Sequence, residues 1–317
     1  MQHSIAEDVC SPSSTESAND VVDQTRHRDK IVFTDSDATA FDSLLRECHG
    51  GMDVYRDLTA DNGKRDRGRY LIAEGRLCVE SLLRSPLEVA SILCRRNLRD
   101  EVERWAEHRK PELRPHCFTA DASTIAAIAG FAFHRGVLAA GVRPPERSFD
   151  DLLRLWTATH SDGLDNSHAM VLSGVSDREN YGSIIRSAFG LGIRNFVQDA
   201  STGDAYNRRT IRTSMATVFN AAVYHSNHLA DDLRSLRQNG GRVVVTGFGD
   251  RFDNLVAYRR DDRPTAIVVG HEFDGVDSDI IDVATDRVTI PMAAGVDSMG
   301  VAAASAVVMH HILRAAP

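Results

Sequence analysis

The sequence lacks the features of an exported, membrane-spanning or metal-binding protein. No apolar run approaches the roughly 20 residues that a membrane span needs. Residues 1–30 contain no basic segment followed by an apolar one, so we expect no secretory signal. The five cysteines are scattered and form no C-x-x-C pair, which argues against a disulfide framework or a zinc site. We therefore expect a cytoplasmic protein that binds neither a membrane nor a metal.

Three common nucleotide and hydrolase motifs are also missing. The chain has no G-x-G-x-x-G after a first strand, no G-x-x-x-x-G-K-[ST] loop and no G-x-S-x-G turn. These absences disfavour a dinucleotide-binding Rossmann site, a P-loop nucleotide hydrolase and a serine hydrolase.

The charge is unevenly distributed and carries few lysines. The net charge is −8, but residues 1–37 alone hold 3 basic and 8 acidic groups, a net of −5, and we expect this acidic tail to be disordered. Residues 38–150 hold 18 basic and 17 acidic groups. All but three basic residues are Arg, which makes bidentate phosphate contacts. The acidic total therefore does not exclude RNA as a partner.

Beyond the tail, the pattern of apolar residues predicts two α/β domains, 38–145 and 150–317. The linker between them is Arg143-Pro144-Pro145, since proline restricts its own backbone and that of the residue before it. In the first domain we expect strands at 70–74 and 89–94 and helices at 77–83 and 97–108.

The second domain alternates strands and helices, which predicts an α/β fold with a mostly parallel sheet. We expect buried strands, apolar on both faces, at 169–172, 195–198, 218–223, 242–246, 266–270 and 287–290. Asp177 is placed to cap a helix that includes 184–189, a further helix covers 229–236, and an apolar helix at 301–313 is expected to be buried, against another subunit.

Loops that follow parallel strands are where ligands bind in such folds, and three loops here carry polar residues. They span 173–180, 270–275 and 291–300. Each loop also has an ordinary structural explanation. Its glycines can simply form turns, and Glu272 can cap a helix or pair with an arginine. Arg186 can lie on a solvated helix face, and Ser298 can be an N-cap. The arginines at 208, 209 and 212 are equally compatible with phosphate binding and with a solvated helix.

The order of these segments resembles that of SpoU/TrmH-type RNA 2′-O-ribose methyltransferases of the SPOUT superfamily. LSGVSDRENYGSIIRSAFGLGI resembles the first family motif, in which an Asn precedes an Arg by six residues. AIVVGHEFDGV resembles the second motif, and VTIPMAAGVDSMGVAAASAV resembles the third. NRRTIRTSMATVFNAAV looks like the basic segment that lies between them.

The resemblance implies a C-terminal trefoil-knotted domain, a homodimer and S-adenosyl-L-methionine as cofactor. The residues that match the family's catalytic positions are Asn180, Arg186, Glu272 and Ser298. Those that match its cofactor-binding positions are Thr246, Gly247, Gly270, Ile290 and Met299. In the family, Arg186 is a candidate base or a phosphate clamp. Because Arg titrates above about 12, we favour the clamp.

The upstream domain resembles the ribosomal-protein-like α/β domain of rRNA methyltransferases, including the thiostrepton-resistance type. The segments YLIAEGRLCVESLLRSP and FHRGVLAAGVRP carry this resemblance. It implies an RNA-binding role for the domain, with rRNA favoured over tRNA. We expect RNA contacts from Arg135, Arg208, Arg209 and Arg212.

Two positions depart from the family pattern. The third motif normally contains Ser-Leu-Asn, whereas this chain has Ser298-Met299-Gly300, and Ala216 stands where Gly is common. Gly300 removes an amide from the expected site. Two alternatives therefore stay open beside RNA methylation: a non-catalytic RNA or cofactor binder, and a methyltransferase with a small molecule or another acceptor.

Overall fold

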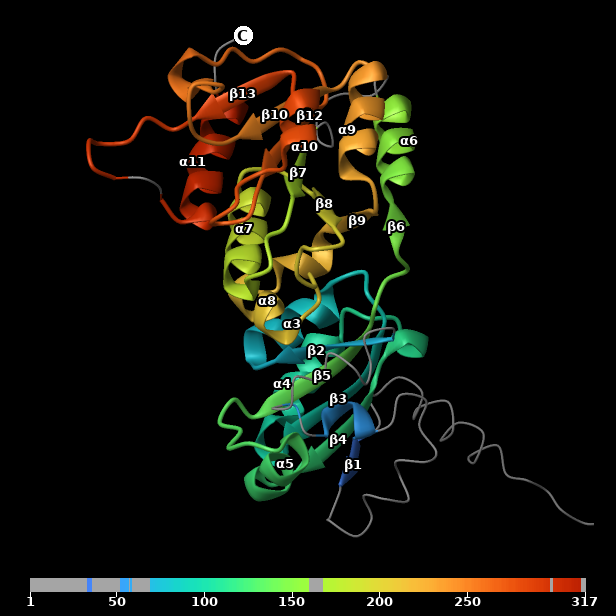
Figure 1. Cartoon of the computed structure of the whole chain (residues 1–317). Coiled ribbons are helices and arrows are strands. Elements are labelled where there is room, and N and C mark those ends of the chain that lie inside the picture. The colour runs from blue at the N-terminus through green and yellow to red at the C-terminus, as the bar shows by residue number, and fades with distance from the viewer. Residues whose placement is uncertain are drawn as a thin grey trace, which may run out of the picture.

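The computed structural model of the chain describes residues 33–35, 52–56, 58, 69–159, 168–296 and 299–314. These residues form two β-sheets, one in each half of an elongated molecule (Figure 1). Most of the expected acidic tail and the predicted catalytic residue Ser298 lie outside the described residues. The last part of the tail, Phe33–Asp35, forms strand β1 and pairs with the first sheet.

The first sheet is mixed and has five strands in the order β1-β4-β3-β5-β2. Its further strands are β2 (Tyr70–Glu74), β3 (Val89–Arg95), β4 (His116–Ala120) and β5 (Val137–Val142). Helices α3 (Arg76–Arg84), α4 (Arg99–Ala106) and α5 (Ala122–Ala129) cover it. The predicted strands β2 and β3 and the helices α3 and α4 are confirmed, whereas the sequence analysis missed β4, β5 and α5.

The second sheet has eight strands in the order β11-β13-β10-β12-β7-β8-β9-β6, and every neighbouring pair is parallel. The strands are β6 (Arg147–Ser148), β7 (His168–Leu172), β8 (Asn195–Asp199), β9 (Ala222–Ser226), β10 (Arg242–Thr246), β11 (Asp253–Asn254), β12 (Thr265–Val269) and β13 (Asp286–Thr289). The predicted α/β class with a mostly parallel sheet is confirmed.

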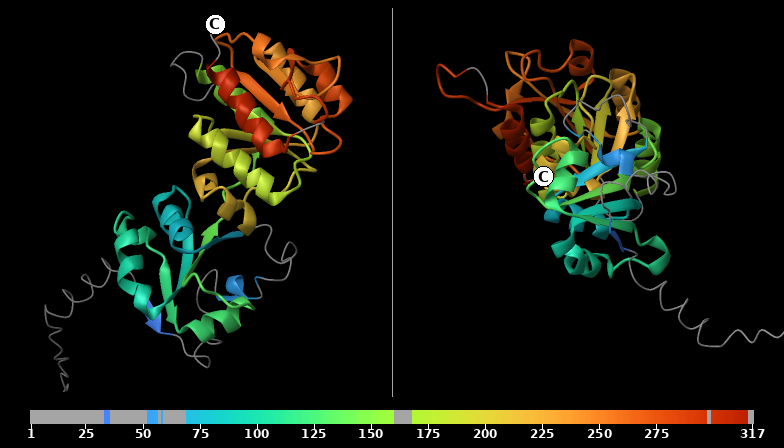
Figure 2. Two further views of the ribbon diagram at one scale, coloured as in Figure 1. Left: turned by 90° about the vertical axis from the view of Figure 1, so that its left-hand side faces the viewer. Right: turned by 90° about the horizontal axis from the view of Figure 1, so that it is seen from below.

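Helices cover both faces of the second sheet, as the strand pattern requires. Side chains of α6 (Phe149–Thr159), α9 (Leu229–Gln238) and α10 (Ser278–Val283) share one buried cluster on one face. Helices α7 (Arg178–Gly190) and α11 (Val301–Arg314) pack against each other on the other face, and α8 (Arg208–Thr213) packs against α7 (Figure 2). The second face is continuous with the core of the first sheet, because Leu71 and Cys78 belong to the same buried cluster as Phe219.

Two expectations about the second domain are wrong in detail, and a third is not tested by a single chain. Residues 218–223 do not form one strand. Met215 and Ala216 adopt positive φ angles of 52° and 64°, and the chain then makes a 3-10 helix, η4 (Thr217–Asn220), before β9 begins. In β13 only Val288 is buried, because the two-residue strand β11 is its neighbour on one side. Helix α11 buries one side within this chain and leaves Val307 on another side 44% exposed, and its burial against another subunit stays a prediction.

The close contact between α7 and α8 depends on Gly182. A Cβ atom added to Gly182 would lie 2.7 Å from the carbonyl oxygen of Thr210 and 2.7 Å from the Cβ of Thr213. Asp177 caps α7 as predicted, since its side chain accepts hydrogen bonds from the backbone N–H groups of Glu179 and Asn180. Together these contacts fix the position and the starting point of the helix that carries Asn180 and Arg186.

We expect Gly182→Ala to lower the free energy of unfolding by about 1–2 kcal/mol. Alanine favours a helix by up to about 1 kcal/mol, but overpacking against α8 costs about 1–3 kcal/mol and outweighs it. Gly190→Ala is the matched control, because an added Cβ meets nothing within 4 Å there. Urea denaturation of both variants measures the difference, and equal stabilities would show that α8 does not crowd Gly182.

Candidate active site

A cavity of about 500 Å³ opens at the carboxyl ends of β10, β12 and β13. The loops that follow these three strands meet there because parallel strands end at the same edge of a sheet. Side chains of α11 close the remaining side of the cavity. The five residues predicted to bind a cofactor all line this cavity: Thr246, Gly247, Gly270, Ile290 and Met299.

Two glycines in the cavity walls leave space for neighbouring groups that a side chain would displace. A Cβ atom on Gly270 would lie 2.2 Å from the carbonyl oxygen of Gly275, which belongs to a tight turn closed by backbone hydrogen bonds between His271 and Gly275 of 2.9 and 3.0 Å. A Cβ atom on Gly247 would lie 2.4 Å from the ring of Phe252. A side chain at Gly270 would therefore collide with main-chain atoms, whereas a side chain at Gly247 would require the Phe252 ring to move. The walls present main-chain groups as well as side chains.

Two of the predicted catalytic residues are in direct contact. The side-chain amide of Asn180, on α7, donates a hydrogen bond of 2.5 Å to the carboxylate of Glu272, which follows β12. Glu272 also lines the cavity. Arg186 lies six residues further along α7 and is exposed, and no hydrogen bond among the described residues joins it to Asn180 or Glu272. The structure thus brings Asn180 to the cavity and leaves Arg186 available at the surface.

A half-buried carboxylate holds the loop after β7 in place. Asp199, at the end of β8, accepts hydrogen bonds from the hydroxyl of Ser173 and from the backbone N–H of Gly174. It also accepts hydrogen bonds from Ser201 and Thr202. Burial raises the pKa of Asp199, but these hydrogen bonds outweigh burial and leave its pKa below the usual value. Asp199 therefore stays ionised and fixes the loop that leads into α7.

The four arginines predicted to contact RNA divide into different environments. Arg135 and Arg208 approach the buried carboxylate of Glu74 at 3.3 and 3.4 Å, at the joint between the two sheets. Burial lowers the pKa of Arg208, and Glu74 opposes that shift. Arg209 is exposed and pairs with Glu179 at 2.6 Å, while Arg212 is half-buried nearby. Arg208 thus has a structural contact that the sequence did not reveal.

Sequence reasoning missed several cavity residues because their side chains are apolar. Phe252 and Val308 line the cavity, but a single Phe or Val in a sequence is not distinguishable from a core residue. The described residues contain no group of three or more His, Cys, Asp or Glu side chains arranged to hold a metal ion. None of the described helices is long and apolar enough to cross a membrane.

Known proteins resemble this chain over most of its length. Residues 167–310 match the model of the SpoU rRNA Methylase family. An uncharacterised tRNA/rRNA methyltransferase of Mycobacterium bovis is 30% identical over 270 residues, which cover 83% of this chain and 88% of the relative. The 23S rRNA (guanosine(2553)-2′-O)-methyltransferase RlmP of Bacillus subtilis is 24% identical, with 78% of this chain and 90% of the relative covered.

A solved structure shows the same fold. The AdoMet-bound rRNA methyltransferase of Sinorhizobium meliloti superposes with a TM-score of 0.71 at 19% sequence identity. The match covers 89% of this chain and 98% of that chain.

We expect Arg208→Ala to lower the free energy of unfolding by about 1–3 kcal/mol, because it removes a charge partner from the buried carboxylate of Glu74. Arg209→Ala, on an exposed pair, should change it by less than about 1 kcal/mol. Thermal and urea denaturation of the two variants provide the comparison. If both variants were as stable as the unmodified chain, Arg208 would have no structural part in the joint between the sheets.

Proposed function

The chain belongs to the SpoU rRNA methylase family, and on this premise we propose that it methylates a ribose 2′-hydroxyl of RNA with S-adenosylmethionine as cofactor. The observation that carries the proposal is the cavity at the carboxyl ends of β10, β12 and β13. All five expected cofactor residues line it, and the Asn180–Glu272 pair lies at its edge.

The composition of the cavity fits S-adenosylmethionine. An adenine ring needs an apolar slot with a few N–H and C=O partners, and Phe252, Ile290 and Val308 provide apolar walls beside the main chain at Gly270. The volume lies in the range of small-molecule sites. When bound, S-adenosylmethionine supplies a methyl group that is already activated by a sulfonium. The protein then has mainly to align the acceptor with that methyl group.

We assign the remaining polar groups to the RNA. Asn180, held by Glu272, orients the acceptor ribose, and Arg186 positions the adjoining phosphate through its guanidinium. Arg186 is suited to this task because it is exposed on the helix that begins at the cavity. Ser298, whose position lies outside the described residues, is assigned by the family resemblance to a hydrogen bond near the reacting atoms.

Gly300 bears on whether the chain keeps the family's activity. An added Cβ at Gly300 would meet nothing within 4 Å, and its φ is not positive. The family's Asn would therefore fit, so crowding does not explain the glycine. This observation favours the alternative that the acceptor has changed or that the chain binds RNA or cofactor without turnover.

The first sheet with its helices is the proposed RNA-holding domain, residues 38–145, ahead of a methyltransferase domain at 150–317. We favour rRNA over tRNA because the relative RlmP is named for 23S rRNA. We also propose that the chain acts in the cytoplasm. We also infer that the C-terminal domain is a trefoil knot, in keeping with three successive strand loops that meet at one cavity. An experimental structure in which these loops pass one another unthreaded would contradict the knot.

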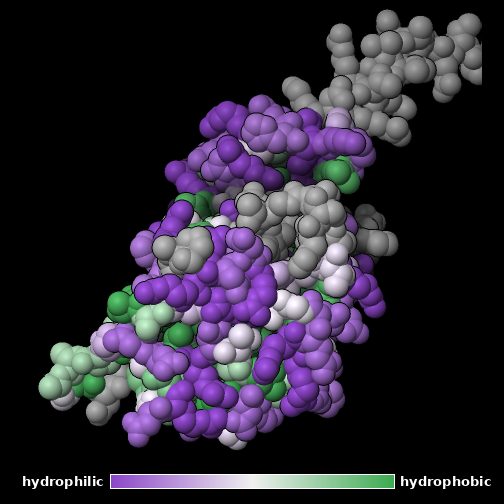
Figure 3. All heavy atoms as spheres, turned by 90° about the horizontal axis from the view of Figure 1, so that it is seen from above, coloured by the Kyte–Doolittle hydropathy of each residue, from purple (hydrophilic) through white to green (hydrophobic). Residues whose placement is uncertain are grey.

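We further propose a homodimer, since apolar side chains gather beside the cavity on the outside of the chain. The loop at 291–296 projects from one side and is largely apolar (Figure 3). Phe273, in the turn after β12, is 91% exposed, and Val296 and Val307 are about half-exposed. A second copy of the chain that covered these residues would bury apolar surface next to both active sites.

Sedimentation analysis of the unmodified chain should give a particle mass twice that of one chain, which is 34.8 kDa. Val307→Asp should shift the protein toward the monomer, because it places a charge in the proposed interface. Leu113→Asp is the control, since Leu113 is similarly exposed but belongs to η3 (Pro111–Leu113), next to the first sheet. A monomeric unmodified chain would refute the dimer.

Arg186→Ala should reduce methyl transfer at least about a hundredfold, because a misplaced acceptor loses alignment. Its affinity for S-adenosylmethionine, measured by calorimetry, should stay within about twofold. Tritiated methyl transfer to total RNA measures turnover, and mass spectrometry of the nucleosides distinguishes ribose from base methylation. Arg154→Ala, an exposed arginine on α6, should be fully active.

Three results would overturn parts of this proposal. Normal turnover of Arg186→Ala would remove Arg186 from the site. Cofactor binding by the unmodified chain without transfer to any RNA would favour the non-catalytic or altered-acceptor alternative. Failure to bind S-adenosylmethionine would remove the cofactor assignment altogether.

A further inference from the structure

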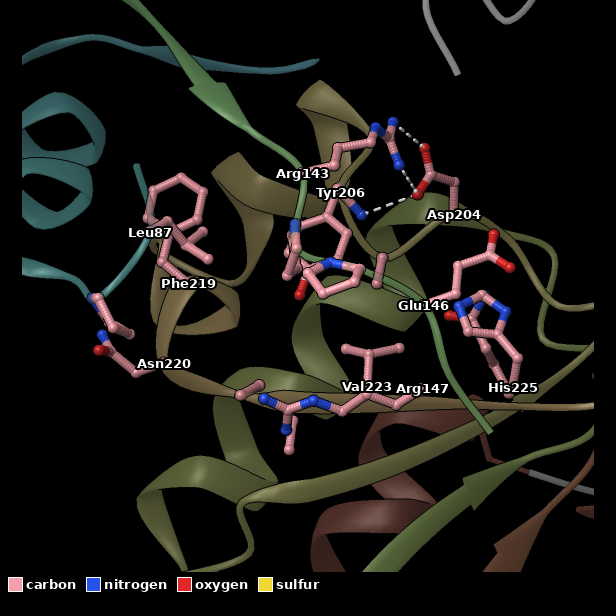
Figure 4. Close-up of a pocket in the computed structure, with 17 residues that line it drawn as sticks. Leu87, Arg143, Glu146, Arg147, Asp204, Tyr206, Phe219, Asn220, Val223 and His225 are labelled. Carbon is pink, nitrogen blue, oxygen red and sulfur yellow. Dashed lines mark hydrogen bonds and ion pairs between the residues drawn. The ribbon is translucent and has the colours of Figure 1, made fainter. Parts of the chain in front are cut away.

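A second cavity, of about 420 Å³, lies where the chain passes from the first sheet to the second (Figure 4). The connecting segment 143–147 forms one wall, and the segment 219–223, which leads into β9, forms another. None of its lining residues belongs to the cavity at β10, β12 and β13. The proposed methylation mechanism does not use it.

One side of this cavity suits a flat, apolar group. Leu87 and Phe219 lie on one side of the cavity in Figure 4, and Tyr206 lies between them and the opposite side. Phe219 is only 2% exposed, so the accessible ring is that of Tyr206. Pro144 and Pro145 of the connecting segment add further apolar surface. Aromatic rings and prolines of this kind are surfaces on which an unstacked nucleobase packs.

The opposite side carries groups that can read the edge of a base. Gln198 is buried, and its side-chain oxygen accepts a hydrogen bond of 2.6 Å from the hydroxyl of Tyr181. That contact fixes the amide so that its nitrogen faces Nδ1 of His225 at 3.4 Å. His225 is half-buried and points toward the cavity beside Glu146 (Figure 4). Amide and imidazole groups held in this way are typical base-edge partners.

The charges around the cavity nearly cancel. Arg143 makes two hydrogen bonds of 2.9 and 2.6 Å to the carboxylate of Asp204, which also accepts from the backbone N–H of Tyr206 (Figure 4). Arg147 and Glu146 are the other opposite charges in the lining. An uncharged base therefore suits the interior better than a phosphate does. Arg147, which is exposed, is available for the sugar-phosphate chain outside.

Helix α7 contacts an element at each cavity. Helix α11, which lines the first cavity, packs against α7, and η4, which lines the second, also packs against α7. Strand β9 is separated from β12 and β10 by three and four strand spacings, so the cavities are roughly 15–20 Å apart. About four to six stacked nucleotides span that distance. RNA that joined the cavities would pass near α7, which carries Arg186, because elements lining both cavities pack against this helix.

We propose that this second cavity accepts one unstacked nucleobase of the RNA substrate, a few nucleotides from the methylated ribose. The inference rests on the proposed function, because it takes RNA as the substrate. The second cavity would then be a specificity site. The base that it accepts would determine which nucleotide of the RNA reaches Arg186 and the first cavity.

Ala221→Trp tests the proposal by filling the cavity. Ala221 lines it in extended conformation directly before β9, two residues from Val223, which also lines it. The variant should bind a large-subunit rRNA transcript about tenfold more weakly, which is the loss expected for one stacked base. Its affinity for S-adenosylmethionine should not change. Asn239→Trp is the control, since it adds the same side chain at an exposed turn before β10.

His225→Phe, which keeps an aromatic ring but removes the base-edge partner, is a second variant should Ala221→Trp fail to fold.

Crosslinking locates the base directly. A transcript that contains 4-thiouridine, irradiated with the unmodified chain, should crosslink to residues in the tryptic peptides 195–208 and 213–234, which hold Gln198, Tyr206, Phe219 and His225. Ala221→Trp should lose these crosslinks. Free nucleoside 5′-monophosphates should bind weakly and compete only at high concentration.

The outcomes separate this inference from the proposed function. Equal RNA binding by Ala221→Trp, His225→Phe and the control, with methyl transfer intact, would overturn the base-binding cavity and leave RNA methylation standing. Tight binding of a free monophosphate, with RNA binding insensitive to both variants, would assign the cavity to a free nucleotide and overturn the RNA inference. If the unmodified chain neither bound nor methylated RNA, both proposals would fall.

Discussion

The close approach of main-chain segments at Gly270 is the constraint on which the first cavity depends. At Gly270 the backbone of Gly275 occupies the space that any side chain would take. The turn between His271 and Gly275 also places Glu272 where it accepts the hydrogen bond from Asn180. The shape of the cavity and the position of its polar edge are therefore set by the same short turn.

The joint between the two sheets has both an apolar and a charged part. The buried cluster that contains Leu71 also contains Phe219, so apolar packing runs without interruption from one sheet to the other. Around it, Glu74 approaches Arg208, and Arg143 forms a bidentate pair with Asp204. These contacts hold the first sheet in a defined position against the second. A substrate that touches both sheets would meet a prearranged surface, which reduces the ordering cost of binding.

Arginine has two tasks in this chain, and its position in the fold separates them. Arg208 and Arg143 are engaged by carboxylates at the joint, whereas Arg186 and Arg147 are exposed beside the two cavities. The net charge of −8 does not describe this arrangement, because the acidic residues are concentrated elsewhere, in residues 1–37 above all. Local placement of arginine is therefore a better guide to RNA contacts here than total charge.

The sequence by itself determined the α/β class, most of the parallel strands, the Asp177 cap and the family resemblance, because these follow from local periodicity and from short motifs. Through the order of the family motifs it also named five of the residues that line the first cavity, and both Asn180 and Glu272, although their mutual contact came only from the structure. It failed at 218–223, where two residues with positive φ turn the chain into a 3-10 helix despite its strand-like composition. The pairing of Arg208 with Glu74 and the whole second cavity were decided by tertiary structure alone. Both bring together residues far apart in the chain, and no local pattern records which distant segments will meet.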